Sequence, residues 1–318
     1  MSVKNLFVRD IQPASKIEDT FLVVEKNLVI SQKGSLYLSL RLRDKTGDVE
    51  GRVWDRAAEL NRMFQKGDVV FVRSRAVRYR EATQLSITDI EKPDPADVRM
   101  EDYAPTSRFG AEEMFQALQA FVEGIENPFL KNLLHGIFGD AEIAGLFKRA
   151  AAAKAMHHFY AGGLLEHTLS VTRILDFLSR HYERVNRDLL LTGGMLHDIG
   201  KIHELSPNGM IDYTDEGRLI GHIVIGLELV DLKMAAVPDF PPDLAMELRH
   251  ILISHHGAFE YGSPKRPKTE EALMVYFADD LDAKVNAFQE FIDDSNDEES
   301  RWTPFHRLFE RYIYKGPR

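Results

Sequence analysis

The hydrophobic pattern of this 318-residue chain changes once, near residue 95, and the change divides the chain into two parts. Before that point apolar residues alternate with polar ones, as in strands that bury one face. Further along they recur every three or four residues, as in amphipathic helices. At about 150 residues per domain the length suits two domains. We therefore expect a β domain in residues 1–95, a linker in residues 96–112 and a helical domain in residues 113–318.

Five strand-like segments in the first part predict a small barrel. They cover residues 21–30, 35–43, 49–54, 69–79 and 84–90, and a short helical segment, 57–64, lies between the third and fourth. The alternation is clearest in the second segment, where every other residue is leucine: Leu36, Leu38, Leu40 and Leu42. This order of strands and helix is typical of an OB-fold, a barrel that often binds single-stranded nucleic acid.

The outer faces of the predicted strands carry aromatic and basic residues that suit such binding. Tyr37 and Arg41 share one face, Trp54 lies on the next strand and Arg75 on a third. Aromatic rings stack bases at ~1–3 kcal/mol each, and arginines follow the phosphate backbone. The alternative is that the rings of Trp54 or Tyr79 plug the barrel and that the arginines are only solvated.

Composition excludes several kinds of site. The chain has no cysteine, so disulfides, a thiol nucleophile and thiolate zinc sites are excluded, and any metal must bind nitrogen or oxygen ligands. No apolar run approaches the ~20 residues of a membrane span, and the N-terminus does not resemble a secretory signal. We therefore expect a cytoplasmic protein with no membrane partner. The net charge is −10, yet residues 1–95 are slightly basic and all 12 histidines lie beyond them.

Histidine and aspartate recur on five helical segments of the second part. In the first segment His167 comes shortly after two glycines, and the second ends in His197 and Asp198, with its end placed at Gly200. His222 begins the third segment, and His255 and His256 lie at the end of the fourth, before Gly257. In the fifth segment Asp279 and Asp282 share a face. Imidazoles and carboxylates bind divalent ions, and an aspartate can bridge two of them. Two ions roughly 3.5–4 Å apart can activate water for in-line attack on a phosphodiester.

Each of these residues also has an ordinary structural explanation. A single histidine on an apolar face is more often a hydrogen-bonded core residue, His255 and His256 suit a helix C-terminus, and Asp279 suits an ion pair. Burying four or five such groups together without a common partner would be very costly. A shared metal centre removes that cost, and this favours the metal hypothesis.

The motifs resemble those of the HD-domain metal phosphohydrolases. They are Gly-Gly-Leu-Leu-Glu-His (162–167), His-Asp-Ile-Gly-Lys (197–201), Gly-His (221–222), His-His-Gly (255–257) and Ala-Asp (278–279), in the family order. Together with the N-terminal barrel, the stretch His-His-Phe-Tyr-Ala-Gly-Gly (157–163) and the loop 262–267, the whole layout resembles the YhaM-type 3′–5′ exoribonucleases.

The resemblance implies a role for each matching residue. Seven residues would hold two divalent ions, with Asp198 as the bridge: His167, His197, Asp198, His222, His255, His256 and Asp279. Lys201 would contact a phosphate oxygen in the transition state, against the alternative of a solvated lysine at a helix end. His157, His158, Lys265 and Lys284 would contact substrate.

The implied activity is hydrolysis of single-stranded RNA from its 3′ end to nucleoside 5′-monophosphates, with single-stranded DNA left open. Mn²⁺ suits the oxygen and imidazole ligands, as do Zn²⁺, Co²⁺ and Fe²⁺. Two alternatives remain: an HD phosphohydrolase of small nucleotides, and a single-strand-binding protein with a structural metal. Assembly into a homo-oligomer is left open. A phosphate-binding loop for ATP is excluded, because Ile202 stands where Ser or Thr would follow Gly200-Lys201.

Overall fold

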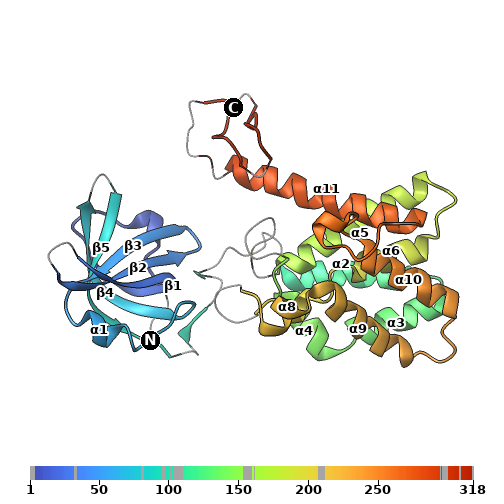
Figure 1. Ribbon diagram of the computed structural model, residues 1–318, viewed down its shortest axis with the longest axis horizontal. Helices are drawn as coiled ribbons and strands as arrows, with labels where there is room; N and C mark the ends of the chain where they lie inside the picture. The colour runs from blue at the N-terminus through green and yellow to red at the C-terminus, as the bar shows by residue number, and fades with distance from the viewer. Residues whose placement is uncertain are drawn as a thin grey trace. The chain divides into compact units, whose positions relative to one another are not determined.

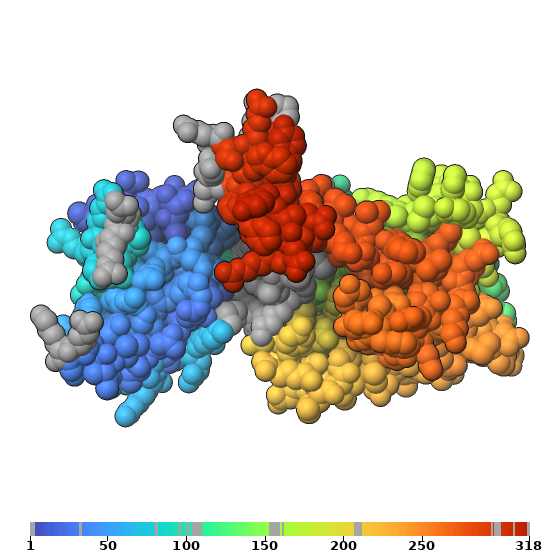
Figure 2. All heavy atoms as spheres, turned by 45° about the horizontal axis from the view of Figure 1, so that its top comes forward, coloured from blue at the N-terminus to red at the C-terminus, as the bar shows by residue number. Residues whose placement is uncertain are grey.

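The computed structural model describes residues 4–31, 34–79, 82–94, 97–99, 102–103, 110–152, 160, 162–206, 212–293, 295, 300–307 and 309–316. The chain divides into two compact units, one built mainly from residues 1–106 and the other mainly from residues 107–318. Figure 1 shows the strands of the first in blue to cyan and the helices of the second in green to orange, and Figure 2 shows their surfaces in the same colours. No helix within the described ranges is long and apolar enough to cross a membrane.

The first unit is a closed five-stranded barrel with the strand order β1-β2-β3-β5-β4. Its strands are β1 (Lys16–Ile30), β2 (Leu36–Asp44), β3 (Gly47–Val53), β4 (Val69–Tyr79) and β5 (Ala82–Glu91). The short helix α1 (Ala57–Leu60) lies between β3 and β4, and a 3₁₀ turn (Val8–Asp10) precedes β1. β3 and β5 pair in parallel, and the other pairs are antiparallel. The predicted OB-fold is confirmed.

The alternation in β2 explains how the barrel is filled. Leu38, Leu40 and Leu42 are buried inside, whereas Leu36, which we expected on the same face, is 38% exposed at the start of the strand. On β3, Gly51 leaves room for the barrel interior, because a Cβ there would lie 2.6 Å from the side chain of Ile87. Residues of the predicted linker also pack here, since the hydroxyl of the buried Tyr103 donates to Thr20 Oγ1 at 2.5 Å.

The second unit, where the structure describes it, consists of helices and three isolated β-bridges. Its helices are α2 (Ala111–Glu123), α3 (Pro128–Phe138), α4 (Ala141–Arg149), α5 (Gly163–His181), α6 (Arg187–Leu196), α7 (Lys201–Glu204), α8 (Asp215–Leu219), α9 (His222–Ala235), α10 (Pro242–Ser254) and α11 (Glu270–Asp293), with a 3₁₀ turn (Phe259–Tyr261) after α10. The side chains of Asn127 and Asp140 accept from backbone N–H groups and cap α3 and α4. One apolar core joins α2–α7 with α9, α10 and α11.

Two glycines fix the turns that carry the histidines. Gly257 has φ +76° in the turn that follows α10, two residues beyond the C-cap His255. The expectation for Gly200 was wrong, because α6 already ends at Leu196 and Gly200 has right-handed helical angles. It is needed for another reason: a Cβ there would lie 2.0 Å from the carbonyl oxygen of His222. Gly200 therefore lets the backbone of α9 come close to the turn after α6.

Candidate metal centre

The seven residues expected to bind metal come together from five separate places in the helical unit. His167 lies on α5, His197 and Asp198 in the turn after α6, His222 at the start of α9, His255 and His256 after α10, and Asp279 on α11. Their possible ligand atoms form two groups in which all atoms lie within 4.8 Å of one another. One group is His167, His197 and Asp279, and the other is Asp198, His222, His255 and His256.

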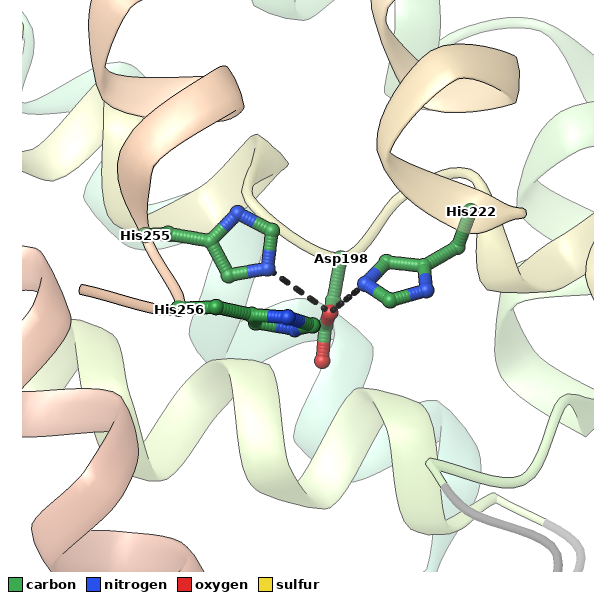
Figure 3. Close-up of side chains that lie close together, drawn as sticks. All are labelled: Asp198, His222, His255 and His256. Atoms are coloured by element: carbon green, nitrogen blue, oxygen red, sulfur yellow. Dashed lines mark ion pairs between the residues drawn. The ribbon is translucent and has the colours of Figure 1, made fainter. Parts of the chain in front are cut away.

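Asp198 joins the two groups through its two carboxylate oxygens. Oδ2 lies 3.3 Å from His197 Nε2 and 3.7 Å from His167 Nε2. Oδ1 lies 3.5 Å from His222 Nε2 and 3.6 Å from His255 Nε2. Figure 3 shows the imidazoles of the second group pointing toward this carboxylate. A carboxylate divided in this way has the arrangement of a ligand shared by two cations.

Backbone carbonyls fix the orientation of three of the imidazoles. Each accepts a hydrogen bond from an Nδ1–H: Gly194 from His197 at 2.8 Å, Leu252 from His255 at 2.7 Å, and Tyr261 from His256 at 2.8 Å. A proton on Nδ1 leaves Nε2 with a free lone pair, which is the form that binds metal.

Carboxylates fix the orientation of the other two imidazoles, again through contacts with Nδ1. His167 Nδ1 lies 2.7 Å from Asp282 Oδ2, and Ser170 also donates to Asp282. His222 donates to Glu204 Oε1 from both its backbone N–H and its Nδ1, each at 3.0 Å. Sequence analysis placed Asp282 beside Asp279 but gave it no role, and it missed Glu204. A signal for Glu204 exists, since it lies one turn beyond Lys201 in the short helix after the His-Asp pair.

Unsatisfied polar atoms at the centre of these groups support a bound cation. Asp198 Oδ1, His222 Nε2 and His255 Nε2 are buried and have no hydrogen-bond partner among the described residues. His167 Nε2 and His197 Nε2 lie 3.3 Å apart, so with both Nδ1 atoms protonated their lone pairs would repel unless a cation or a proton lay between them. Buried polar atoms without partners cost ~1–3 kcal/mol each. The donor set of five imidazoles and two carboxylates therefore fits divalent cations.

The same charges shift the pKa values of the residues around the centre. Burial opposes ionisation of Asp198, but Lys201 and His197 hold its pKa well below the ordinary value. Burial also opposes a charge on His167, yet hydrogen bonds to Asp279 and Asp282 raise its pKa to about 10. In the absence of metal, a proton on His167 thus supplies positive charge at this point. Burial lowers the pKa of His255 and of His256, which keeps their lone pairs available.

The residues expected to contact substrate lie in different environments. Lys201 Nζ is 2.6 Å from Asp198 Oδ2, and the negative charges nearby raise its pKa against the effect of burial. Lys284 is exposed on α11 and pairs with Asp280 at 2.7 Å. Lys265 lies in the loop after α10 and lines a cavity of about 340 Å³. His157 and His158 lie outside the described residues.

The barrel residues expected to bind nucleic acid lie partly together. The rings of Tyr37 and Trp54 stack with centroids 4.7 Å apart, and Trp54 is 52% exposed. Neither Trp54 nor Tyr79 plugs the barrel, because both rings are exposed, and Tyr79 is 55% exposed. Arg41 pairs with Glu25. Arg75, on β4, approaches the carbonyl oxygen of Ala14 at 3.4 Å.

Comparisons with known proteins match both units. Residues 164–284 match the HD domain family, and residues 22–93 match a family described as OB-fold nucleic acid binding domain. The chain is 34% identical to the 3′–5′ exoribonuclease YhaM of Geobacillus sp. (strain WCH70), over 84% of this chain and 82% of that protein. It is 30% identical to YhaM of Bacillus subtilis (85% and 86% covered) and 34% identical to YhaM of Listeria welshimeri (84% and 85% covered).

Proposed function

The chain belongs to the family of YhaM 3′–5′ exoribonucleases, and on this basis we propose that it degrades single-stranded RNA from the 3′ end with divalent metal ions. The observation that carries the proposal is the divided carboxylate of Asp198, whose two oxygens face two sets of imidazoles. A structural metal site needs a single closed set of ligands, whereas paired sites are typical of phosphodiester hydrolysis.

We propose two ions with separate ligand sets. His167, His197 and Asp279 would hold the first, and His222, His255 and His256 the second, with Asp198 shared between them. Two such ions lower the pKa of water and stabilise both the attacking and the leaving oxygen of a phosphodiester. Mn²⁺ is the ion we expect, because a nitrogen and oxygen donor set without thiolate suits it.

The remaining polar groups of the centre position the substrate and offset charge. Lys201 carries a raised pKa, so it is protonated at neutral pH. Its Nζ is close to Asp198 but its side chain retains 14% exposure, so it can also reach a phosphate oxygen. A fixed cation there stabilises the negative charge that develops in the transition state. Asp282 and Glu204 keep His167 and His222 in the metal-binding tautomer.

The barrel supplies a second place for the RNA strand. Of the stacked pair, Tyr37 lies on β2 and Trp54 directly follows β3. The face of these two strands binds oligonucleotides in OB-folds. The guanidinium of Arg52 lies 5.6 Å from the Tyr37 ring, which places a positive charge beside the stack. We propose that this face holds the unpaired strand upstream of the cleaved end, through stacking and charge.

The test is degradation of end-labelled single-stranded RNA with Mn²⁺, with and without EDTA, by the wild type and by His197→Ala. We expect stepwise shortening from the 3′ end with release of nucleoside 5′-monophosphates, and loss of the activity with EDTA or with the substitution. RNA that is bound but not cut would contradict the proposal and favour a binding protein. Cleavage of small nucleotides alone would favour the other class of HD phosphohydrolase.

A further inference from the structure

The metal centre is open to solvent on one side. The side chains of His167, His197, Asp198 and His255 are at most 2% exposed, whereas those of His222 and Asp279 are 12% and 17% exposed. His256 is half-buried. Among the ligands of the centre, His222, His256 and Asp279 are therefore the ones that a phosphodiester can approach from solvent. Side chains beside these three residues are the ones that meet the nucleotides next to the cleaved bond.

The loop 257–268 borders this opening and is tied to it. It follows His256 directly, and His256 Nδ1 donates to the carbonyl oxygen of Tyr261 at 2.8 Å. Gly257 lies against the ring of Tyr276 on α11, since a Cβ there would be 2.3 Å from that ring. The hydroxyl of the buried Ser263 bonds to the carbonyl oxygen of Lys265 at 2.7 Å. The loop therefore has a fixed position relative to a residue of the centre.

Two aromatic rings of this loop point into solvent. Phe259 and Tyr261 are 58% and 65% exposed, although both lie within a few residues of His256. The guanidinium of Arg266 lies 5.0 Å from the centroid of the Phe259 ring. Exposed rings with an arginine beside them form a stacking site that accepts any unpaired base, because every base has a π face.

The charge of the loop suits a phosphate backbone. Residues 257–268 contain Lys265, Arg266 and Lys268 but only one acidic residue, Glu260, within a chain of net charge −10. Lys265 and Lys268 line the same cavity of about 340 Å³ as Arg249. The positive side chains of this loop, which directly follows His256, attract the phosphates of the strand.

We propose that Phe259 and Tyr261 stack the bases at the 3′ end of the RNA, while Lys265 and Arg266 bind the adjacent phosphates. The inference rests on the proposed function and deepens it, because it assigns recognition of the 3′-terminal nucleotides to the helical unit rather than to the barrel. It also gives a reason for a single-stranded substrate, since bases must be unpaired to stack on protein rings.

The test compares the full-length wild type with Phe259→Ala and Tyr261→Ala on two RNA tetranucleotides. One carries all its bases, and the other has abasic riboses at its two 3′-terminal positions. We expect the wild type to cut the abasic RNA at least about thirtyfold more slowly in kcat/KM, because both stacks are lost. Each alanine variant removes one stack and should be about five- to a hundred-and-sixtyfold slower on the complete RNA, mainly through KM. It should lose much less on the abasic RNA.

Matched variants separate stacking from general damage. Phe259→Tyr and Tyr261→Phe keep a ring and should retain activity, and Phe177→Ala removes a ring that is 71% exposed on α5 and should match the wild type. The bound Mn²⁺ should not change in Tyr261→Ala, because the contact of this residue with His256 is through its backbone. Equal losses on both RNAs, or no loss on the complete RNA, would overturn the stacking site.

Binding without cleavage distinguishes this inference from the proposed function. In EDTA, the wild type should bind the complete tetranucleotide more tightly than the abasic one, and Phe259→Ala should reduce that difference. A wild type that shows this preference but never shortens RNA in Mn²⁺ would reject the exoribonuclease and keep the stacking site. A wild type that shortens RNA but binds both tetranucleotides equally would reject the stacking site and keep the exoribonuclease.

Discussion

Replacing Glu204 with glutamine tests whether the residues behind the imidazoles control metal binding. Glu204 Oε1 accepts two hydrogen bonds from His222, one from the backbone N–H and one from Nδ1, each at 3.0 Å. Burial opposes ionisation of Glu204, but the bonds from His222 hold its pKa below the ordinary value, so it is charged at neutral pH. Glutamine keeps the shape and one acceptor oxygen, and it removes the charge.

The size of the effect follows from these contacts. Outer partners of metal-binding histidines typically contribute 10–100-fold to metal affinity, which is about 1.4–2.7 kcal/mol. We expect the lower end of this range, because the amide oxygen of glutamine can still accept both bonds. The loss should be confined to the ion held by His222, His255 and His256. The other ion depends on His167, which Asp282 orients.

Calorimetric titration of EDTA-treated and dialysed protein with Mn²⁺ measures both affinities. Glu228→Gln, on an exposed part of the same helix α9, is the matched control and should bind both ions as the wild type does. Unchanged affinities in Glu204→Gln would refute the role of His222 as an oriented ligand. Equal weakening of both ions would refute the division of the centre into two sites.

Three further perturbations test other parts of the structure. In EDTA, the pKa of His167 is about 10 in the folded protein and 6.5 in the unfolded chain, so protonation of this residue stabilises the fold fully below pH 6.5. The free energy of unfolding should fall as the pH rises toward 10, by at most ~1.4 kcal/mol per pH unit. Urea unfolding with no such decline would contradict the buried imidazolium. Gly200→Ala should lower the free energy of unfolding in urea by ~1–3 kcal/mol or more, because its Cβ would meet the backbone of α9. Gly136→Ala has open space around it and should raise the free energy of unfolding by ~0.5–1 kcal/mol. Equal effects of the two substitutions would refute the close approach. Trp54→Ala should weaken the binding of a long single-stranded RNA, measured by fluorescence anisotropy, by ~1–3 kcal/mol. Trp302→Ala removes an equally exposed indole near the C-terminus and should leave the affinity unchanged. A wild-type affinity in Trp54→Ala would exclude base stacking at the pair Tyr37 and Trp54.

Sequence patterns predicted the parts of this protein whose signals are local. The alternating leucines of β2 indicated the buried face of a strand, and three of the four are buried inside the barrel. The barrel followed because the order of short strands and one helix is typical of few folds. The conjunction of histidines and aspartates indicated a metal centre, and the resemblance to HD-domain phosphohydrolases implied the seven residues that the fold brings together.

Contacts between distant segments could not be predicted from the pattern alone. Glu204 and Asp282 fix imidazoles that lie 18 and 115 residues away in sequence, and no periodicity connects such pairs. Gly200 looked like the end of a helix, but its small size is needed where α9 crosses the turn after α6. Each of these features depends on the packing of helices against one another, which the sequence specifies only through the complete fold.

Anomalous scattering from crystals grown with Mn²⁺ tests the central claim most directly. The account predicts two anomalous peaks, one on each side of the Asp198 carboxylate and roughly 3.5–4 Å apart. The first should lie among His167, His197 and Asp279, and the second should lie among His222, His255 and His256. No peak at these residues, or a single peak that leaves one of the two groups unbound, would contradict it.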